Sequence, residues 1–403
     1  MPSTNPSYKE IRPAEWINRV IAEGIEKGAS DVHIEPFLNR FVIRYRINGI
    51  LYTVEEMPIA YLETITSHLK VLSQLNITER RMPQDGHLLF YPKGTVTKEP
   101  MDLRISIFPT VYGEAVVMRI QNRKDLLFES LEKLGIDKST AERMRLLLER
   151  PSGMILVTGL GGSGKTTTLY TILNYFLSQK IERNILTLED PVELYLPGIR
   201  QAQIRPDIGF TFAMGLRSIL RQDPNVVMVG EIRDEETAEI SIRAALMGAL
   251  FFSTMHTINS VGAITRLLEF GSSPSLVASA LLCIVSQRLM RILCENCKEE
   301  DRPTQKLRHL TGISPDDNSI FYKGKGCKEC NGTGYKGRTG IFEVMFIDRK
   351  IHELILKRAT FIEIEKQAKE DGMETLQEIA IRKAKEGITS LEEVLRVIPF
   401  FNP

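Results

Sequence analysis

Short apolar stretches alternate with polar residues in the first third of the chain, and they predict a small domain of helices and strands. Two segments carry apolar residues at the spacing of an amphipathic helix, namely 13–27 and 59–72. Three segments alternate with the period of two that is typical of half-buried strands, namely 40–47, 101–108 and 114–120. We therefore predict an α+β domain over residues 1–121, followed by a linker of mixed charge over residues 122–135.

From residue 136 onward the apolar positions form short continuous runs, which indicates strands buried on both faces. These runs are separated by helical segments and lie at 154–157, 184–188, 226–229 and 250–254. Buried strands that alternate with helices are typical of an α/β fold. The apolar segment 276–289 is expected to be a helix that buries Cys283, and a helical tail is expected over 348–398. The predicted second domain is 136–403.

A glycine-rich stretch at 159–167 separates one of these strands from a predicted helix. It reads Gly-Leu-Gly-Gly-Ser-Gly-Lys-Thr-Thr, which fits the pattern of a phosphate-binding loop. The glycines let backbone N–H groups converge on phosphate oxygens, and the helix start adds partial positive charge. A glycine-rich turn without a ligand is the alternative, and the strand–loop–helix setting disfavours it. The residues expected to bind a nucleoside triphosphate are Gly159, Gly161, Gly162, Ser163, Gly164, Lys165, Thr166 and Thr167.

Individual side chains of this loop have distinct expected roles. Lys165 is expected to reach the β- and γ-phosphates, and the hydroxyl of Thr166 is expected to bind Mg²⁺. ATP and Mg²⁺ are therefore the predicted ligands of the loop.

Acidic residues and a histidine follow the other buried strands, at the edge where open α/β sheets bind ligands. Glu189 follows the strand 184–188, and Glu231 follows the strand 226–229 after Gly230, where a P-loop enzyme usually has aspartate. His256 follows the strand 250–254. A lone histidine is often structural, but its place at a strand end favours a catalytic role. We predict Lys165, Glu189, Glu231 and His256 as catalytic residues.

Two arginines of the first domain are further candidates. Arg104 and Arg119 lie on two predicted strands joined by a short connection, so that both side chains could contact one anion. The alternative is that both lie on a solvated face of the sheet.

Four of the five cysteines form two Cys-x-x-Cys pairs, which predicts a metal site rather than disulfides. The pairs are Cys294 with Cys297 and Cys327 with Cys330. Four thiolates satisfy a tetrahedral Zn²⁺ ion, so a zinc-binding insertion is expected over residues 294–337. The alternative is two redox-active or merely buried pairs.

Composition narrows the possible classes of protein. The chain has 403 residues, enough for two or three domains, and a formal net charge of +1, so that no direct nucleic-acid partner is expected. No stretch of 18 uninterrupted apolar residues occurs, and the polar first residues argue against a secretory signal. With thiols paired for metal binding, these features predict a cytoplasmic protein.

Several blocks together are similar to a known family. They are Ala-Ser-Asp-Val-His-Ile-Glu-Pro at 29–36, Arg-Met-Pro-Gln-Asp-Gly at 81–86, Asp-Leu-Arg-Ile-Ser at 102–106, Glu-Asp-Pro-Val-Glu at 189–193, Leu-Arg-Gln-Asp-Pro at 220–224, Gly-Glu-Ile-Arg-Asp at 230–234 and Ser-Thr-Met-His-Thr at 253–257. In these blocks and across nearly its whole length, the chain resembles the secretion-superfamily ATPases that drive type II secretion and type IV pilus assembly.

The resemblance implies a fold and a mode of action. It implies a RecA-like P-loop core with a smaller, PAS-like N-terminal domain, assembled as a homohexamer that binds ATP between domains. Arg104 and Arg119 would contact the phosphates, and Arg338 would lie near the same interface. Glu189 and Glu231 would share water activation and Mg²⁺ organisation, with the choice of base left open.

The resemblance also implies partners and a location. The motor would act at the inner membrane through a platform protein of a pilus or secretion machine. Many members dock through an additional N-terminal domain, and either a truncated chain or a short member without that domain is expected here, so membrane docking is left open. The four cysteines favour the pilus assembly and type II secretion branch of the family, because its retraction motors generally lack that insertion. A DNA-translocating or conjugation relative is a further candidate class, and a zinc-knuckle binding module with a non-hydrolysing core is another.

Overall fold

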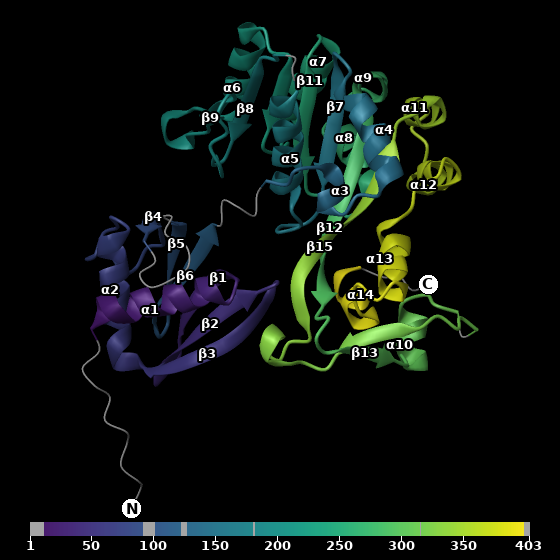
Figure 1. Ribbon diagram of the computed structural model, residues 1–403. Helices are drawn as coiled ribbons and strands as arrows, with labels where there is room; N and C mark the ends of the chain where they lie inside the picture. The colour runs from purple at the N-terminus through teal and green to yellow at the C-terminus, as the bar shows by residue number, and fades with distance from the viewer. Residues whose placement is uncertain (1–11, 92–100, 122–126, 180–181, 315, 399–403) are drawn as a thin grey trace, which may run out of the picture. The chain divides into compact units, whose positions relative to one another are not determined.

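The computed structural model describes residues 12–91, 101–121, 127–179, 182–314 and 316–398, and the chain divides into two units (Figure 1). The first unit is Met1–Lys124 and the second is Asp125–Pro403. Part of the predicted linker, residues 122–126, lies outside the described residues. The last residues of the predicted linker belong to the second unit. They form the short helix Leu131–Leu134, and both leucines pack into the core of that unit.

The first unit is a six-stranded antiparallel sheet with helices packed against it. The strand order is β3-β2-β1-β6-β5-β4. Its elements are α1 (Pro13–Glu26), β1 (Ala29–Pro36), β2 (Arg40–Ile47), β3 (Ile50–Pro58), α2 (Leu62–Leu72), β4 (Gln84–Phe90), β5 (Met101–Thr110) and β6 (Gly113–Gln121), with a 3-10 turn at Ile59–Tyr61. Alternate strand residues such as Ile34, Ile43 and Ile105 pack with Trp16 and Ile65 of the helices. The predicted α+β architecture follows from this one-sided burial.

The second unit is a seven-stranded sheet in the order β15-β12-β7-β11-β10-β8-β9. Every neighbouring pair is parallel except β12 with β15. Its strands are β7 (Gly153–Thr158), β8 (Ile185–Glu189), β9 (Arg200–Gln203), β10 (Val226–Val229), β11 (Leu250–Met255), β12 (Leu281–Leu293) and β15 (Tyr335–Phe346). The helices before β12 are α3 (Leu131–Leu134), α4 (Lys138–Leu148), α5 (Lys165–Ser178), α6 (Phe212–Ile219), α7 (Glu235–Leu246), α8 (Ser260–Glu269) and α9 (Pro274–Ala280), with 3-10 turns at Pro206–Ile208 and Leu220–Gln222.

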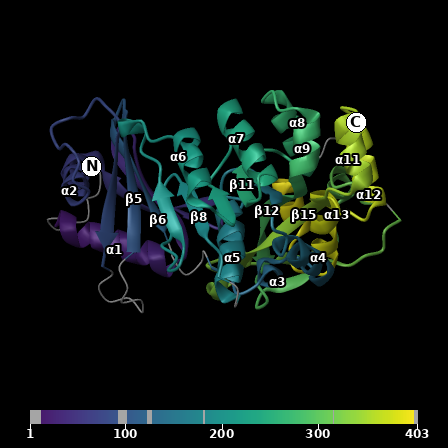
Figure 2. The ribbon, with the colours of Figure 1, turned by 90° about the horizontal axis from the view of Figure 1, so that it is seen from above.

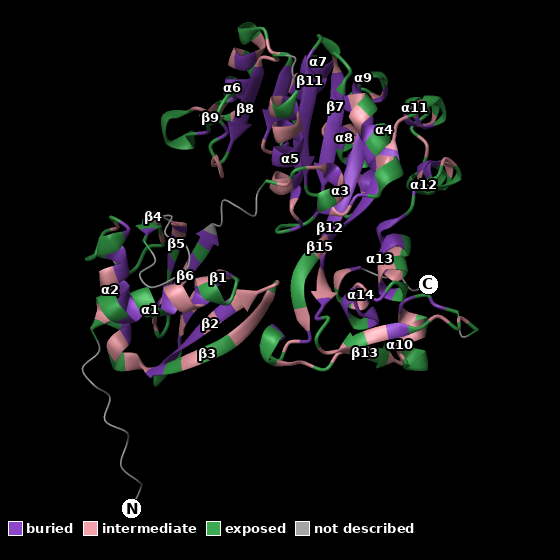
Figure 3. Ribbon diagram, in the orientation of Figure 1, coloured by how far each residue is buried: buried purple, intermediate pink, exposed green. Residues whose placement is uncertain are grey.

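Helices cover both faces of this sheet, with α7, α8 and α9 on one side and α3, α4 and α5 on the other (Figure 2). The inner strands therefore contribute side chains to two separate cores. In β7, Met154 and Leu156 join the core on one face, and Ile155 and Val157 join the core on the other. All residues of β7, β10 and β11 are buried (Figure 3). Burial on both faces explains the continuous apolar runs, and the predicted α/β fold class is confirmed.

The segment 276–289 was expected to be one apolar helix, and this prediction is wrong. The helix α9 ends at Ala280, and β12 begins at Leu281. Cys283 is fully buried, but it lies in β12 between β7 and β15. A short continuous apolar run fits a buried strand as well as a buried helix, and here the hydrogen-bonding partners on both sides decide.

The remaining elements follow β12. They are β13 (Lys298–Asp301), α10 (Gln305–Leu310), β14 (Phe321–Gly324), a 3-10 turn at Lys328–Cys330, then β15, α11 (Arg349–Leu356), α12 (Phe361–Glu370), α13 (Leu376–Lys385) and α14 (Leu391–Val397). An ion pair links the last helix, α14, to the sheet. Glu393 of α14 is fully buried and accepts hydrogen bonds from the backbone N and the Nε of Arg291 in β12, both at 2.9 Å.

Candidate functional site

The phosphate-binding loop connects β7 to α5, as the sequence predicts. Gly164 precedes the helix with a φ of 90°, and Gly159 has a φ of 151°, so both use backbone conformations that favour glycine. Space also requires glycine, because a Cβ on Gly159 would lie 2.6 Å from the carbonyl oxygen of Gln287. The hydroxyl oxygens of Thr158 and Ser163 are buried and have no hydrogen-bond partner among the described residues. The loop therefore has unused polar groups suited to phosphate.

Lys165 is the first residue of α5, and its side chain folds back over the loop. Its Nζ donates to the carbonyl oxygens of Gly159 at 2.9 Å and Leu160 at 3.2 Å. Only 9% of the residue is exposed, and burial lowers the pKa of its ammonium, an effect that Glu231 opposes and Arg288 reinforces. The ammonium thus lies at the loop and is held there by groups that a phosphate could replace. Thr166 and Thr167 follow it, half-buried in the first turn of the helix.

Gln287 of β12 is a contact of this loop that the sequence analysis missed. Its Nε2 donates to the carbonyl oxygen of Ser163 at 2.8 Å, and its Oε1 accepts from the hydroxyl of Thr168 at 2.8 Å. Because β12 was expected to be a helix, nothing in the sequence pattern placed Gln287 beside the loop. The register of the two parallel strands does so, since Ser286 pairs with Thr158 at the last residue of β7.

Glu189 ends β8 and is buried with hydrogen bonds at both carboxylate oxygens. Tyr170 of α5 donates to Oε2, while Thr187 at 2.5 Å and Gln201 at 3.1 Å donate to Oε1. Burial raises the pKa of Glu189, and these donors act against that shift. The Tyr170 hydroxyl also accepts from the backbone N of Glu193, at 3.2 Å. Glu189 therefore links the helix behind the phosphate-binding loop to the segment 189–193.

Glu231 lies beyond the end of β10, and its carboxylate accepts fewer hydrogen bonds than that of Glu189. Arg233 donates to Oε1. Oε2 is buried with no hydrogen-bond partner among the described residues, although the Nε2 of His256 lies 3.3 Å from it. His256 follows β11, the strand between β7 and β10. Glu231, His256 and Lys165 therefore all lie at the carboxyl ends of three neighbouring strands. Asp234, in the same motif, caps α7 by accepting from the backbone N of Thr237 at 2.8 Å.

The predicted arginines of the first unit lie side by side on the sheet face opposite its helices. They belong to a row of residues that lie opposite one another on five neighbouring strands. From β2 to β4 the row is Arg46, Asp31, Arg119, Arg104 and His87. The Nε of Arg119 donates to the Oδ1 of Asp31 at 3.0 Å, and Asp31 is 5% exposed. Asp31 is a second residue that the sequence analysis missed, because register alone brings it between Arg46 and Arg119.

Arg338 is exposed on β15, where it is the Cα partner of Arg291. It lies on the part of the β12–β15 hairpin that leads to the cysteines, beyond the pairing of Gln287 with Phe342. A role for Arg338 with nucleotide stays a prediction.

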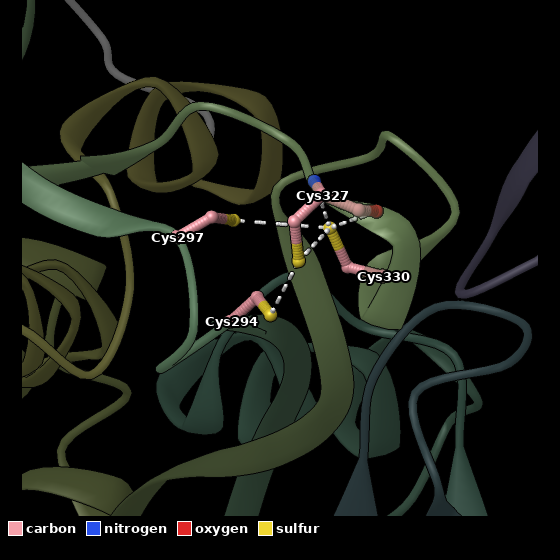
Figure 4. A group of neighbouring side chains, drawn as sticks. All are labelled: Cys294, Cys297, Cys327 and Cys330. Atoms are coloured by element: carbon pink, nitrogen blue, oxygen red, sulfur yellow. Dashed lines mark hydrogen bonds between the residues drawn. The ribbon is translucent and has the colours of Figure 1, made fainter.

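The four cysteines come together as one cluster that could hold a metal ion (Figure 4). Their ligand atoms all lie within 4.8 Å of one another. The sulfur of Cys294 lies 3.8 Å from that of Cys327, and the sulfur of Cys297 lies 3.8 Å from that of Cys330. The two pairs thus interleave, although residues 298–326 separate them in the sequence.

Backbone groups around the cluster favour a thiolate. Burial disfavours the charged form of Cys330, but the N–H groups of Cys327 and Gly334 donate to its sulfur at 3.1 and 3.2 Å. Together with the thiols of Cys327 and Cys297, these donors lower the pKa of Cys330 to about 6, whereas burial raises the pKa of Cys294 and of Cys297. Glycine is required beside this turn, because a Cβ on Gly324 would lie 2.2 Å from the carbonyl oxygen of Gly334. The cluster therefore has donor atoms and local backbone suited to a tetrahedral metal.

Within the described part of the chain, no helix is both long enough and apolar enough to cross a bilayer.

Known structures share this fold. The ATPase DotB of Legionella pneumophila matches with a TM-score of 0.68 and 19% identity, covering 97% of this chain and 96% of that one. The pilus retraction motor PilT with bound ADP matches with a TM-score of 0.62 and 23% identity, covering 96% of this chain and 97% of that one. At these identities the likeness concerns the fold.

Two relatives found by sequence have a higher identity to this chain than these structures do. The type IV pilus assembly ATPase PilB of Myxococcus xanthus is 43% identical over 382 residues, which cover 94% of this chain and 66% of that protein. The type II secretion system ATPase E of Vibrio cholerae is 44% identical over 381 residues, which cover 94% of this chain and 74% of that protein. The chain therefore spans about two thirds to three quarters of the length of these relatives. A family model described as Type II/IV secretion system protein matches residues 9–396. The predicted resemblance is confirmed, and the chain belongs to the Type II/IV secretion system protein family, which includes the pilus assembly and type II secretion ATPases compared here.

Proposed function

We propose that this protein is a cytoplasmic ATPase motor that hydrolyses ATP at the loop 159–167 to power type IV pilus assembly or type II secretion. The observation that carries the proposal is the convergence of Lys165, Glu231 and His256 at the ends of three neighbouring strands. Phosphoryl transfer depends mainly on such positioned charges. The names of the relatives support the choice of process.

Each site residue has a role in this proposal. The backbone of the loop and Lys165 bind the phosphates, and Thr166 binds Mg²⁺, which neutralises phosphate charge when bound. Glu231 is the residue that orients and activates water, because its Oε2 has no hydrogen-bond donor among the described residues. Glu189 is fully engaged by Tyr170, Thr187 and Gln201, so we assign it to holding the site together.

Arginines of the first unit complete the site in this proposal. Arg104 and Arg119 supply guanidinium groups to the phosphates, and Asp31 orients Arg119 through its Nε. A guanidinium can donate to two oxygens of a phosphate at once. The active form is a homohexamer, in which Arg338 lies near the nucleotide interface.

The metal of the cysteine cluster is Zn²⁺ in this proposal. Four thiolates at the usual Zn–S distance of about 2.3 Å around a tetrahedral ion lie about 3.8 Å apart. The separations between Cys294 and Cys327 and between Cys297 and Cys330 are both 3.8 Å. The agreement supports zinc, and the site supplies local stability rather than chemistry.

The proposed partner is an inner-membrane platform protein of a pilus or secretion machine, which would hold the motor at the membrane. Two pilus or secretion assembly ATPases that are 43% and 44% identical support this reading over a DNA translocase. A retraction motor is the second candidate, because PilT shares the fold.

Phosphate release from the purified protein tests the central claim. We expect Mg²⁺-dependent hydrolysis of ATP, and we expect Lys165→Ala to reduce it to background because the charge that meets the phosphates is lost. Lys138→Ala is the matched control, since the Lys138 side chain is 85% exposed on α4 and pairs with Glu142 at 4.0 Å. Substantial turnover in Lys165→Ala, or equal losses in both variants, contradicts the assignment.

A further inference from the structure

Arg288, next to Gln287 in β12, is a buried cation whose hydrogen bonds go to backbone carbonyl groups. The residue is 4% exposed. Its Nη1 donates to the carbonyl oxygen of Gln287 at 3.1 Å, and its Nη2 donates to that of Ile258 at 2.9 Å. Its Nε is buried and has no partner among the described residues. Burial lowers the pKa of this guanidinium, and the more distant Glu343 only partly offsets the effect.

Such a position is costly, because a buried charge is normally neutralised by a hydrogen-bonded carboxylate. An apolar side chain could fill the same place in the strand without the desolvation free energy that the buried guanidinium costs. The two carbonyl groups that Arg288 holds therefore indicate what the residue does. One belongs to its own strand, and the other belongs to the segment between β11 and α8.

That segment is the one that carries His256. Ile258 lies two residues after His256 and immediately before Asn259, which caps α8 by accepting from the backbone N of Gly262 at 3.0 Å. The cap fixes one side of the segment, and the Nη2 of Arg288 fixes its carbonyl at Ile258. His256 itself is half exposed, with its Nε2 3.3 Å from Glu231. The backbone next to it is thus held more firmly than its own side chain.

The same two residues of β12 also contact the phosphate-binding loop. Gln287 bonds to Ser163 and Thr168. Arg288 lies close to Gly159, because a Cβ added to this glycine would be 3.2 Å from the Nη1 of Arg288. Gln287 and Arg288 therefore join the loop that binds phosphate to the segment that holds His256, two segments that residues 168–255 separate in the sequence.

We propose that Arg288 is a positioning residue for ATP hydrolysis, and that it acts by holding the backbone at 256–259 so that His256 stays beside Glu231. Gln287 anchors the same strand to the phosphate-binding loop, so that movement of the loop reaches His256 through two adjacent residues. The proposal rests on the roles assigned above to His256 and Glu231. A guanidinium suits the task because its planar, forked donors reach two carbonyl groups at fixed angles, which a lysine ammonium does not.

A double-mutant cycle tests whether Arg288 acts through His256. The variants are Arg288→Lys, which keeps the charge and loses the fork, His256→Ala, and the double variant. Each is purified as the full chain, and kcat for ATP is measured together with the dissociation constant of a fluorescent ATP analogue. We expect Arg288→Lys to lower kcat about tenfold with a dissociation constant within about threefold of wild type. We expect the double variant to hydrolyse as slowly as His256→Ala alone.

Arg291→Lys is the matched control, because Arg291 lies on the same strand but bonds to Glu393 of α14. It is expected to lower the melting temperature and leave kcat within about twofold of wild type. If Arg288→Lys is not recovered folded, Arg288→Gln, which keeps an amide donor, takes its place in the cycle.

The outcomes separate this proposal from the proposed function. Wild-type kcat in Arg288→Lys overturns the proposal, as does a double variant in which the two losses multiply. An equal loss in Arg291→Lys also overturns it, because the effect is then one of general strand stability. Wild-type kcat in His256→Ala removes the role of His256 from the proposed function and this proposal with it, while ATP hydrolysis at Lys165 stands.

Discussion

His256 and Glu231 face each other across neighbouring strands, with the Nε2 of the histidine 3.3 Å from the Oε2 of the glutamate. The strands that precede them, β11 and β10, are parallel and paired over the whole length of β10, with Val229 opposite Ser253. Both side chains therefore leave the sheet at the same edge as the phosphate-binding loop. The Oε2 of Glu231, which accepts no hydrogen bond from the described residues, thus lies at this edge, whereas Oε1 accepts from Arg233.

Replacing Glu231 by glutamine is expected to stop hydrolysis while ATP still binds. The amide keeps the size of the side chain but cannot accept a proton from water, so kcat should fall at least ~100-fold. Glu239→Gln on α7 is the matched control, because Glu239 is exposed and pairs with Arg243, one turn along the same helix. Steady-state phosphate release and a nucleotide-binding titration check the prediction. A loss of binding as large as the loss of turnover would make Glu231 a ligand-binding residue instead.

Glu189→Gln is expected to act differently, because Glu189 already accepts three hydrogen bonds. The amide can keep some of these, so we expect a loss of turnover below ~tenfold, about 1.4 kcal/mol in barrier. Burial raises the pKa of Glu189, so its ionisation costs stability as the pH rises through that raised value. The variant lacks this cost, so its melting temperature should fall less than that of wild type as the pH rises above the usual glutamate value of about 4.3. Parallel melting curves across this range would contradict the assignment.

Loss of Arg104 or Arg119 is expected to slow hydrolysis more than it weakens binding. If these cations contact phosphate mainly in the transition state, as proposed, Arg104→Ala and Arg119→Ala should each lose at least ~tenfold in kcat. Asp31→Asn should reproduce a smaller part of the Arg119 effect, because it weakens the bond to Nε. Arg40→Ala, on the exposed start of β2, is the control. Kinetics equal to wild type in both arginine variants would return them to a purely surface role.

Elemental analysis of the purified protein is expected to find about one zinc per chain. Cys327→Ser should lose the metal and loosen the segment 294–337, which limited proteolysis would detect. Cys283→Ser is the control, since Cys283 is buried in β12 and lies outside the cluster. A well-folded protein that contains no metal and has four titratable thiols in the cluster would exclude the site.

The buried carboxylate of Glu393 is expected to make stability depend on pH. Burial favours its neutral form, but hydrogen bonds from Arg396 and Arg291 outweigh burial and lower its pKa. A lowered pKa stabilises the fold above the usual glutamate value of about 4.3, and the effect is lost as the pH falls through the folded value. Glu393→Gln should therefore cost on the order of 3 kcal/mol at pH 7, because the buried carboxylate that both Arg291 and Arg396 contact is neutralised. The difference from wild type should shrink toward pH 3 in urea titrations. A difference independent of pH would contradict this account.

The sequence by itself determined the parts of the site that depend on neighbours in the chain. The phosphate-binding loop needs glycines, a lysine and a following helix within a few residues, and these are visible as a pattern at 159–167. The ends of buried strands are visible in the same way, which led to Glu189, Glu231 and His256. The two cysteine pairs likewise indicated a metal site, because each half of the ligand set is local.

Only the tertiary structure decided what lies beside these local elements. The run 276–289 fits a helix or a strand until β7 and β15 are known to pair with it, and the difference moves Gln287 and Arg288 to the phosphate-binding loop. Asp31 meets Arg119 for the same reason, since strand register joins residues from the two ends of the first unit. The physical cause is that a hydrogen bond is set by distance in space, whereas a sequence pattern reports only distance along the chain. Local periodicity therefore identified the elements whose period was unambiguous, and the order and register of the strands determined which residues lie side by side.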